Sequence, residues 1–175
     1  LNINSNLGAN PKLFDRFISK LKPIIEEKKV KEFKLFTSID TWDKDKAEYI
    51  RNGLDIELFK RNFDKYLTEI KDSKLSLMIT FNNLCVTNFD SLLEQILKWR
   101  EKYNDKDAKE RGNVNQEIQL QRIQMDTPYL KEPPHYDMNI LPKEDFTHYM
   151  NRHLEVMINF QDDDDSTKFK TLEVE

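Results

Sequence analysis

Two polar side chains with the spacing of a ligand-binding pair, Ser38 and Asp40, follow the short apolar run at residues 33–36. Alternate residues of an extended chain point to the same side, so the hydroxyl and the carboxylate can face one ligand. Such a pair can donate to and accept from vicinal hydroxyls, as on a ribose. Turns and helix caps use the same two residue types, and from spacing alone that interpretation is favoured.

Arg51 follows Asp40 by eleven residues. Its planar guanidinium has the geometry to bind a carboxylate or a phosphate through two parallel hydrogen bonds. A surface ion pair with Glu48 or Asp55 uses the same group, and without other context it is the better interpretation.

Three further residues follow or end apolar runs. Asn82 and Asn83 come after the run at 75–79, and their neutral amides suit purine edges or amino-acid groups. Asparagine also satisfies local backbone groups routinely. Met125 lies at the end of a fourth apolar run and has the character to pack on an adenine face, although core packing is the usual role of methionine.

The sequence predicts no metal site. His148 and His153 are five residues apart rather than the four of a helical zinc pair, and His135 is separate. We expect all three histidines at surface or interface positions. Residues 162–165 are acidic but lack the glycine of a calcium loop. Cys85 has no partner that would activate it, so a structural thiol is predicted.

Apolar runs at residues 1–3, 33–36, 75–79 and 118–125 alternate with helical patterns. This order is typical of β/α units in a parallel sheet or barrel, so we expect an α/β fold. In such folds the ligand lies at the carboxyl ends of the strands, where the polar residues above fall.

Caps and apolar spacing give the expected helices. The first helix starts at Asn10 and Pro11 and carries an apolar face to Leu21; Pro23 then ends or kinks it, or the face continues through Ile25. Further helices are expected after Asp55 and after Thr87 or Asn88. The last begins near Pro142, with an inner face from Phe146 to Ile158 that includes Leu154. Residues 104–117 are charged, which predicts an exposed loop.

The composition limits the class of protein. A chain of 175 residues with 38% hydrophobic residues is one domain or a piece of one. A net charge of −4 argues against a general nucleic-acid binder. No apolar stretch approaches the roughly 20 residues that cross a bilayer. The single cysteine indicates a reducing compartment, and we expect a cytoplasmic protein.

The segments Phe-Thr-Ser-Ile-Asp at 36–40 and Ala-Glu-Tyr-Ile-Arg-Asn-Gly-Leu-Asp at 47–55, with Asn-Leu-Gly at 6–8, resemble radical S-adenosylmethionine (radical SAM) enzymes. The resemblance is greatest to the subgroup with a small C-terminal twitch extension. It implies that residues 1–160 are the later part of a partial (β/α)6, TIM-like barrel, with its third to sixth strands. Residues 161–175 would be an acidic tail that starts a truncated extension.

The family's cofactors are S-adenosylmethionine and a [4Fe-4S] cluster on a Cys-x3-Cys-x2-Cys loop. That loop is not in this sequence, and Cys85 alone cannot hold a cluster. The resemblance therefore implies that the N-terminal strands and the cluster ligands lie outside this chain, and that the isolated chain is inactive. We expect it to aggregate through an unpaired, apolar sheet edge.

The resemblance assigns roles to the matching residues. Ser38 and Asp40 would hold the ribose and the methionine amino end, and Arg51 would bind the methionine carboxylate. Asn82 or Asn83 would touch the cofactor or substrate, and Met125 would line the adenine pocket. The partner is then a small-molecule cofactor, with a peptide, nucleoside or sugar as substrate. Two alternatives stay open: a non-catalytic α/β binding module without a cluster, and an unrelated parallel α/β protein whose strand-end residues are caps.

Overall fold

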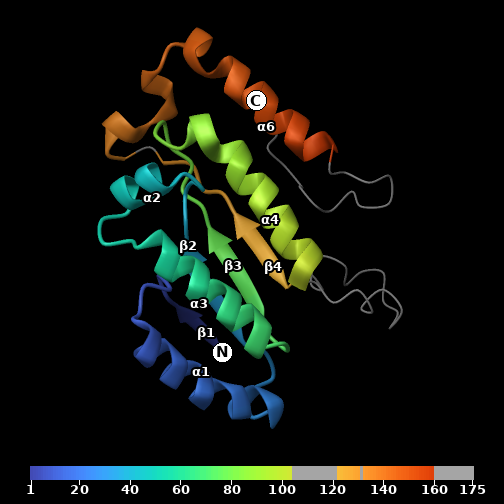
Figure 1. Ribbon diagram of the computed structural model, residues 1–175. Coiled ribbons are helices and arrows are strands. Elements are labelled where there is room, and N and C mark those ends of the chain that lie inside the picture. The colour runs from blue at the N-terminus through green and yellow to red at the C-terminus, as the bar shows by residue number, and fades with distance from the viewer. Residues whose placement is uncertain (104–121, 131, 160–175) are drawn as a thin grey trace.

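The computed structural model describes residues 1–103, 122–130 and 132–159, and these form a four-stranded sheet with helices against it (Figure 1). The strands are β1 (Asn2–Asn4), β2 (Lys34–Ser38), β3 (Lys74–Met78) and β4 (Ile123–Asp126). They lie in chain order and every neighbouring pair is parallel. The predicted α/β fold with parallel strands is confirmed. Strand β4 starts at Ile123, within the apolar run at 118–125, and residues 118–121 lie outside the described residues.

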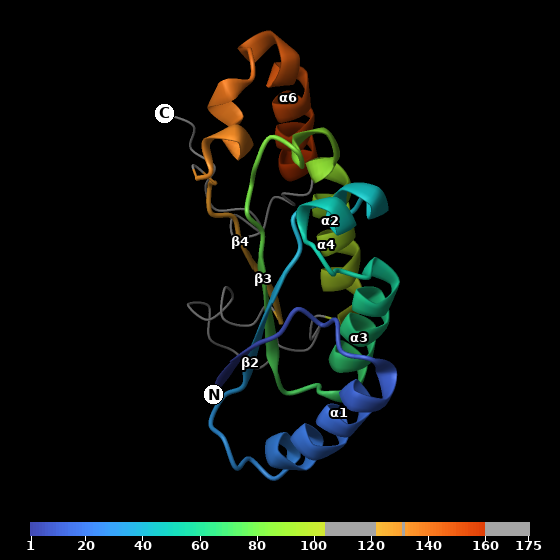
Figure 2. The ribbon, with the colours of Figure 1, turned by 90° about the vertical axis from the view of Figure 1, so that its left-hand side faces the viewer.

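Each strand is followed by helical structure. The α-helices are α1 (Pro11–Glu26), α2 (Lys44–Ile50), α3 (Ile56–Glu69), α4 (Phe89–Tyr103) and α6 (Lys143–Asn159), and the short 3₁₀ helices are η1 (Val86–Asn88), η4 (Pro134–Tyr136) and η5 (Met138–Ile140). Figure 2 shows α1, α3 and α4 on one side of the sheet, which makes two layers. The predicted loop at 104–117 and the tail at 161–175 lie outside the described residues.

The helix starts follow from their caps. The side chains of Asn10, Asp43 and Asp55 each accept a hydrogen bond from a backbone N–H in the first turn of α1, α2 and α3. Pro23 does not end α1, which continues to Glu26. The continuation brings Ile25 into the core, and this packing outweighs the backbone hydrogen bond that proline cannot donate.

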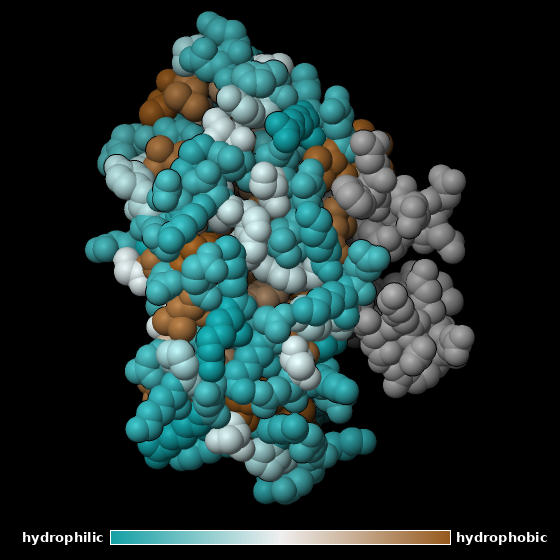
Figure 3. Space-filling model, viewed as in Figure 1, coloured by the Kyte–Doolittle hydropathy of each residue, from teal (hydrophilic) through white to brown (hydrophobic). Residues whose placement is uncertain are grey.

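The core lies between the sheet and the helices. Leu35, Leu75, Leu77 and Ile123 are fully buried, and each alternates along its strand with a residue of the other face. Helix faces complete this core with the buried residues Phe14, Ile18, Phe59, Phe63, Leu92 and Ile96. The outer side of the helices is mostly hydrophilic in Figure 3, with small hydrophobic patches.

Helix α6 packs on α4 and η1. His153 lies there in a buried position, with its ring centroid 5.3 Å from that of Phe89. The prediction of a surface or interface position for His153 is therefore wrong, because an imidazole packed on aromatic rings fills the same space as an apolar side chain. Leu154 and Ile158 are about half exposed, so they do not belong to the predicted inner face.

Among the described residues, no helix combines the length and apolar character needed to cross a membrane.

Candidate functional site

The candidate site is built around an ion pair at the carboxyl ends of β2 and β3. Arg51 Nη2 donates to Asp40 Oδ1 at 2.8 Å, and Arg51 Nε lies 2.8 Å from Asp40 Oδ2. Nη2 thus forms a charge-assisted hydrogen bond, while Nε lies close to the second oxygen without the geometry of a hydrogen bond. Asp40 is almost fully buried, whereas the Arg51 side chain keeps 31% of its surface exposed. The pair therefore presents a guanidinium, not a carboxylate, to a ligand.

The local sequence explains how Arg51 reaches this position. Helix α2 ends at Ile50, and Arg51 donates its backbone N–H to the carbonyl of Ala47. Gly53 then turns the chain with a φ of 82°, a conformation that glycine adopts without strain. The turn leads to Asp55, which caps α3, while Glu48 accepts from the N–H of Ile56. Both carboxylates that could have paired with Arg51 are thus engaged elsewhere.

Asp40 also joins the two strand ends. Its Oδ1 accepts a second hydrogen bond from the backbone N–H of Thr80 at 2.8 Å. The carboxylate is therefore satisfied by a charged donor and a neutral donor. With these bonds Asp40 positions Arg51 and contributes little free capacity to a ligand. This differs from the role in ribose or amino-group binding that the resemblance implies for Asp40.

A pocket of about 240 Å³ opens beside this pair. Its walls combine the ion pair with apolar and aromatic side chains: Asp40, Ile50, Arg51, Thr80, Asn82, Leu84, Leu130, Pro133 and Tyr136. No partner of Arg51 Nη1 is found among the described residues. A pocket with a few polar groups among apolar walls is the usual form of a small-molecule site.

The wall that carries Leu130 and Tyr136 is attached to the end of β3. Phe81 and Tyr129 form a parallel bridge, in which the N–H of Leu130 donates to the carbonyl of Phe81 at 3.0 Å. Asn83 adds two bonds: its Nδ2 donates to the carbonyl of His135 at 2.8 Å, and its backbone N–H donates to the carbonyl of Tyr136 at 3.1 Å. Asn83 therefore fastens the wall of the pocket.

Asn82 lines the pocket, but both ends of its amide are used locally. Nδ2 donates to the carbonyl of Thr80 at 2.9 Å, and Oδ1 accepts from the N–H of Leu84 at 2.9 Å. These bonds shape the turn after β3, as the conservative interpretation of the asparagines expects.

Ser38 and Met125 do not line the pocket. Ser38 ends β2 on the face away from the helices, in register with Met78 and then Asp126. Met125 packs against the core on the helix side of β4. The structure thus brings together Asp40, Arg51 and Asn82, with Asn83 behind the wall. Ser38 lies on an adjoining surface and Met125 on the opposite face of the sheet.

The described residues hold no cluster of histidine, cysteine and carboxylate side chains with the arrangement of a metal site. Cys85 is buried, accepts from the N–H of Asn82 through Sγ and donates to the Asn82 carbonyl. Burial raises the pKa of the Cys85 thiol to about 12. This protonated thiol is unsuited to iron, which binds thiolates.

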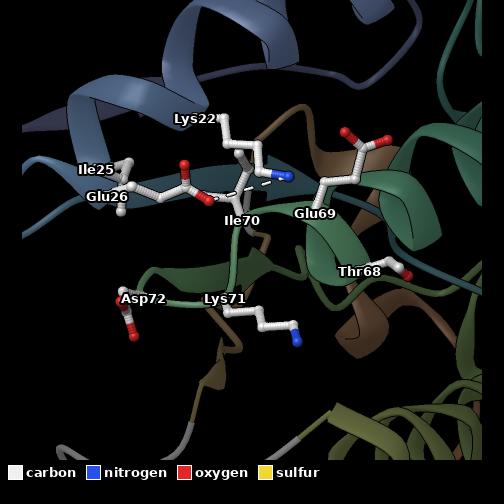
Figure 4. A pocket seen from close by; sticks show the side chains of 8 residues that line it. All are labelled: Lys22, Ile25, Glu26, Thr68, Glu69, Ile70, Lys71 and Asp72. Carbon is white, nitrogen blue, oxygen red and sulfur yellow. Dashed lines mark ion pairs between the residues drawn. The ribbon is translucent and has the colours of Figure 1, made fainter.

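A second pocket, of about 310 Å³, lies at the other end of the molecule, where α1 and α3 end (Figure 4). Its walls carry charges of both signs, and Lys22 and Glu26, one turn apart on α1, form an ion pair at 3.9 Å. Its charged side chains, Lys22, Glu26, Glu69, Lys71 and Asp72, lie at the ends of helices and not at the carboxyl ends of the strands, so we take the pocket at Arg51 as the candidate site.

Sequence reasoning missed the wall of the site. Leu130, Pro133 and Tyr136 lie in a segment with three prolines, Pro128, Pro133 and Pro134, in which residue type and spacing indicate no site. Their place follows from the Phe81–Tyr129 bridge, a contact across 48 residues that leaves no local sequence signal. Thr80 was missed because its contribution is a backbone N–H.

Compared with known proteins, the chain matches no family model, no curated protein and no solved structure.

Proposed function

We propose that this chain binds S-adenosylmethionine at the pocket beside Arg51, as part of a partial (β/α)6 barrel of the radical SAM type. The observation that carries the proposal is the Arg51 guanidinium, oriented by Asp40 and exposed at the carboxyl end of a parallel sheet. A carboxylate bound there would accept from Nη1, while Leu130 and Tyr136 supply apolar contacts to the rest of the ligand.

In this proposal the chain supplies binding and orientation, and the radical chemistry depends on a cluster held by ligands outside it. The cluster supplies the electron that cleaves S-adenosylmethionine. The single, buried Cys85 does not fit it. Outward-facing peptide groups on β1 support the idea of adjoining strands. Leu1 and Ser5 bond to β2, so the alternate residues Asn2 and Asn4 turn their N–H and C=O groups to the free edge.

Calorimetry with two ligands tests the proposal. S-adenosylmethionine carries the amino-acid carboxylate, and 5′-methylthioadenosine lacks it. We expect the wild-type chain to bind the first more tightly, and Arg51→Met to weaken that binding about tenfold or more while leaving the second unchanged. Arg16→Met, on the exposed side of α1, is the matched control and should bind both ligands as the wild type does. Equal affinities for S-adenosylmethionine in wild type and Arg51→Met would exclude the assigned site.

A non-catalytic binding module is the second candidate, favoured by the unreactive state of Cys85. Both candidates bind S-adenosylmethionine, so the distinguishing measurement is its cleavage. The chain is reconstituted anaerobically together with a polypeptide that carries the three-cysteine loop and adjoins it in the parent gene. Formation of 5′-deoxyadenosine supports the radical enzyme, and a bound but uncleaved ligand supports the module.

A further inference from the structure

The face of the sheet opposite the helices carries an unusual set of side chains. We call it the open face; at its alternate strand positions are Asn2, Asn4, Lys34, Phe36, Ser38, Lys74, Ser76, Met78, Gln124 and Asp126. In Figure 2 the labelled helices α1, α3 and α4 lie on the other side. Parallel sheets normally bury apolar residues on both faces. A polar face on such a sheet is typical of a surface that contacts ligand or solvent.

The polarity of the open face is graded along the strands. Lys34 and Lys74 are neighbours in register at the amino ends of β2 and β3. Phe36 comes next on β2, opposite the small Ser76 of β3, and Met78 lies diagonally beyond Phe36 at the carboxyl end of β3. The face thus offers cationic groups at one end and an apolar surface beside them.

Lys74 has a carboxylate partner, whereas Lys34 has a neutral one. Lys74 Nζ lies 2.7 Å from a carboxylate oxygen of Glu32. Lys34 Nζ crosses β3 to donate to Gln124 Oε1 at 2.6 Å and lies 4.9 Å from the centre of the Phe36 ring. No carboxylate of the described residues comes within ion-pair distance of Lys34. Within the described part of the chain, its ammonium therefore has a neutral acceptor and a ring face as neighbours, and no carboxylate in direct contact.

The surroundings also disfavour the charge on Lys34. Burial lowers the pKa of Lys34, and the adjacent Lys74 lowers it further, while Glu32 and Asp126 act in the opposite direction. A bound anion would relieve this cost because it supplies the missing counter-charge in a partly desolvated place. Ser76, between the two strands that Lys34 bridges, is almost fully buried, so the ammonium is held against the sheet and not extended into solvent.

We propose that the open face binds an amphipathic anion, with its phosphate or carboxylate at Lys34 and its apolar body over Phe36 and Met78. This site is separate from the pocket at Arg51. None of Lys34, Phe36 and Met78 lines that pocket, and the anion-binding end at Lys34 is about 13 Å from Ser38 at the rise of a strand. The proposal does not depend on binding of S-adenosylmethionine. A small molecule is favoured over a protein partner because the cation is recessed and the apolar area beside it comprises two side chains.

The test uses phenyl phosphate, phenylacetate and inorganic phosphate as probes of the 175-residue chain. Binding is followed by the methyl signal of Met78 in NMR spectra, assigned with Met78→Leu. We expect phenyl phosphate or phenylacetate to shift this signal at millimolar concentrations and to bind more tightly than inorganic phosphate. The stronger of the two aromatic probes identifies the anionic group as phosphate or carboxylate.

Lys34→Gln should weaken the binding of the better probe about tenfold, as expected for loss of a charged hydrogen-bonding partner. Lys20→Gln, an exposed lysine of α1 with the same change of charge, should leave it unchanged. Thermal unfolding of each variant verifies that it is folded. The proposal is overturned if wild type and Lys34→Gln bind the probe with equal affinity, or if no probe shifts the Met78 signal. It is also overturned if Lys34→Gln changes the oligomeric state without any probe, because the open face would then be a contact between protein chains. Binding of S-adenosylmethionine should be the same in Lys34→Gln and wild type, so this result is read independently of the site at Arg51.

Discussion

The two faces of the sheet share one backbone and differ in almost every other respect. On the helix face Leu35, Leu75 and Leu77 are fully buried. On the open face the adjacent positions are Lys34, Lys74 and Ser76. The strands therefore alternate between positions that stabilise the fold and positions available for recognition. Adjacent residues of one strand therefore have different roles, one in stability and the other in binding. Substitutions at adjacent positions can measure this difference.

The largest expected difference is between Leu77 and Met78. Leu77→Ala removes a fully buried side chain from the helix face and should lower the free energy of unfolding by about 3 kcal/mol. Met78→Ala, one residue further on the open face, should cost less than about 1 kcal/mol. Urea unfolding of the two variants measures both values. Similar losses at the two positions would show that the open face is also part of the core.

The second prediction concerns Asp40, at the carboxyl end of the sheet, which contributes both to stability and to the candidate binding site. Asp40→Asn removes the charge that holds Arg51 and replaces one acceptor oxygen with a donor. We expect a loss of about 2 kcal/mol in unfolding free energy, because a nearly buried ion pair is broken while the arginine stays partly solvated. Binding of S-adenosylmethionine should weaken as well.

The control for Asp40→Asn is Asp15→Asn, which breaks the exposed pair with Arg61 and should change stability little. If the two variants unfold alike, Asp40 has no special role in the structure. If Asp40→Asn binds S-adenosylmethionine as tightly as wild type, Asp40 does not position Arg51 for that ligand.

The third prediction is a dependence on pH that comes from the helix side. Burial lowers the pKa of His153 from its ordinary value of 6.5, with Asp90 opposing and Arg152 reinforcing the shift. The unfolded chain then binds more protons than the folded one below about pH 6.5, so stability falls as the pH drops toward the folded pKa. His153→Phe should remove this part of the pH dependence.

Thermal unfolding of wild type and His153→Phe between about pH 7 and about pH 5 measures the difference. Subtraction of the two stability profiles gives the contribution of His153, including its interaction with Asp90. If wild type and His153→Phe lose the same stability as the pH falls, protonation of His153 does not destabilise the folded protein.

The smallest and opposite effects are expected at Thr37 and Ser38. Thr37 Oγ1 is buried on the helix face and has no hydrogen-bond partner among the described residues. Thr37→Val should therefore stabilise the protein by about 1 kcal/mol. Ser38→Ala on the open face should change stability by less than about 0.5 kcal/mol. It should still weaken S-adenosylmethionine binding a few-fold if Ser38 contacts the ribose. Calorimetry and urea unfolding of both variants check the pair, and a destabilised Thr37→Val would contradict the assignment of the faces.

Much of the fold was predictable because its signals are local. Asn10 with Pro11 and the capping Asp55 mark helix starts directly, and the apolar runs mark the strands. The faces were harder to assign. Leu13 fits the apolar spacing of α1 yet is exposed, because the stripe through Phe14 and Ile18 is the one that packs.

The site was predicted in part. Spacing alone favoured caps for Ser38 and Asp40 and a surface ion pair for Arg51, whereas the resemblance to radical SAM enzymes selected all three as a site. The structure joins Asp40 and Arg51 in an ion pair. The choice between Asp40 and the nearer Glu48 or Asp55 as partner of Arg51 depended on the turn at Gly53, which spacing does not specify. The expected apolar edge is also different, because the exposed side chains of β1 are Asn2 and Asn4.

Asp40 accepts hydrogen bonds from the chain after α2 and from the chain after β3. Through Thr80 and the turn at Asn82 it is continuous with Asn83, which holds the carbonyls of His135 and Tyr136. Ligand contact with Arg51 therefore restrains more than one loop. A ligand in the pocket should slow amide hydrogen exchange as far away as Leu130. Three segments that are distant in the sequence, at Arg51, at residues 80–83, and at Leu130 with residues 132–136, would then become rigid together.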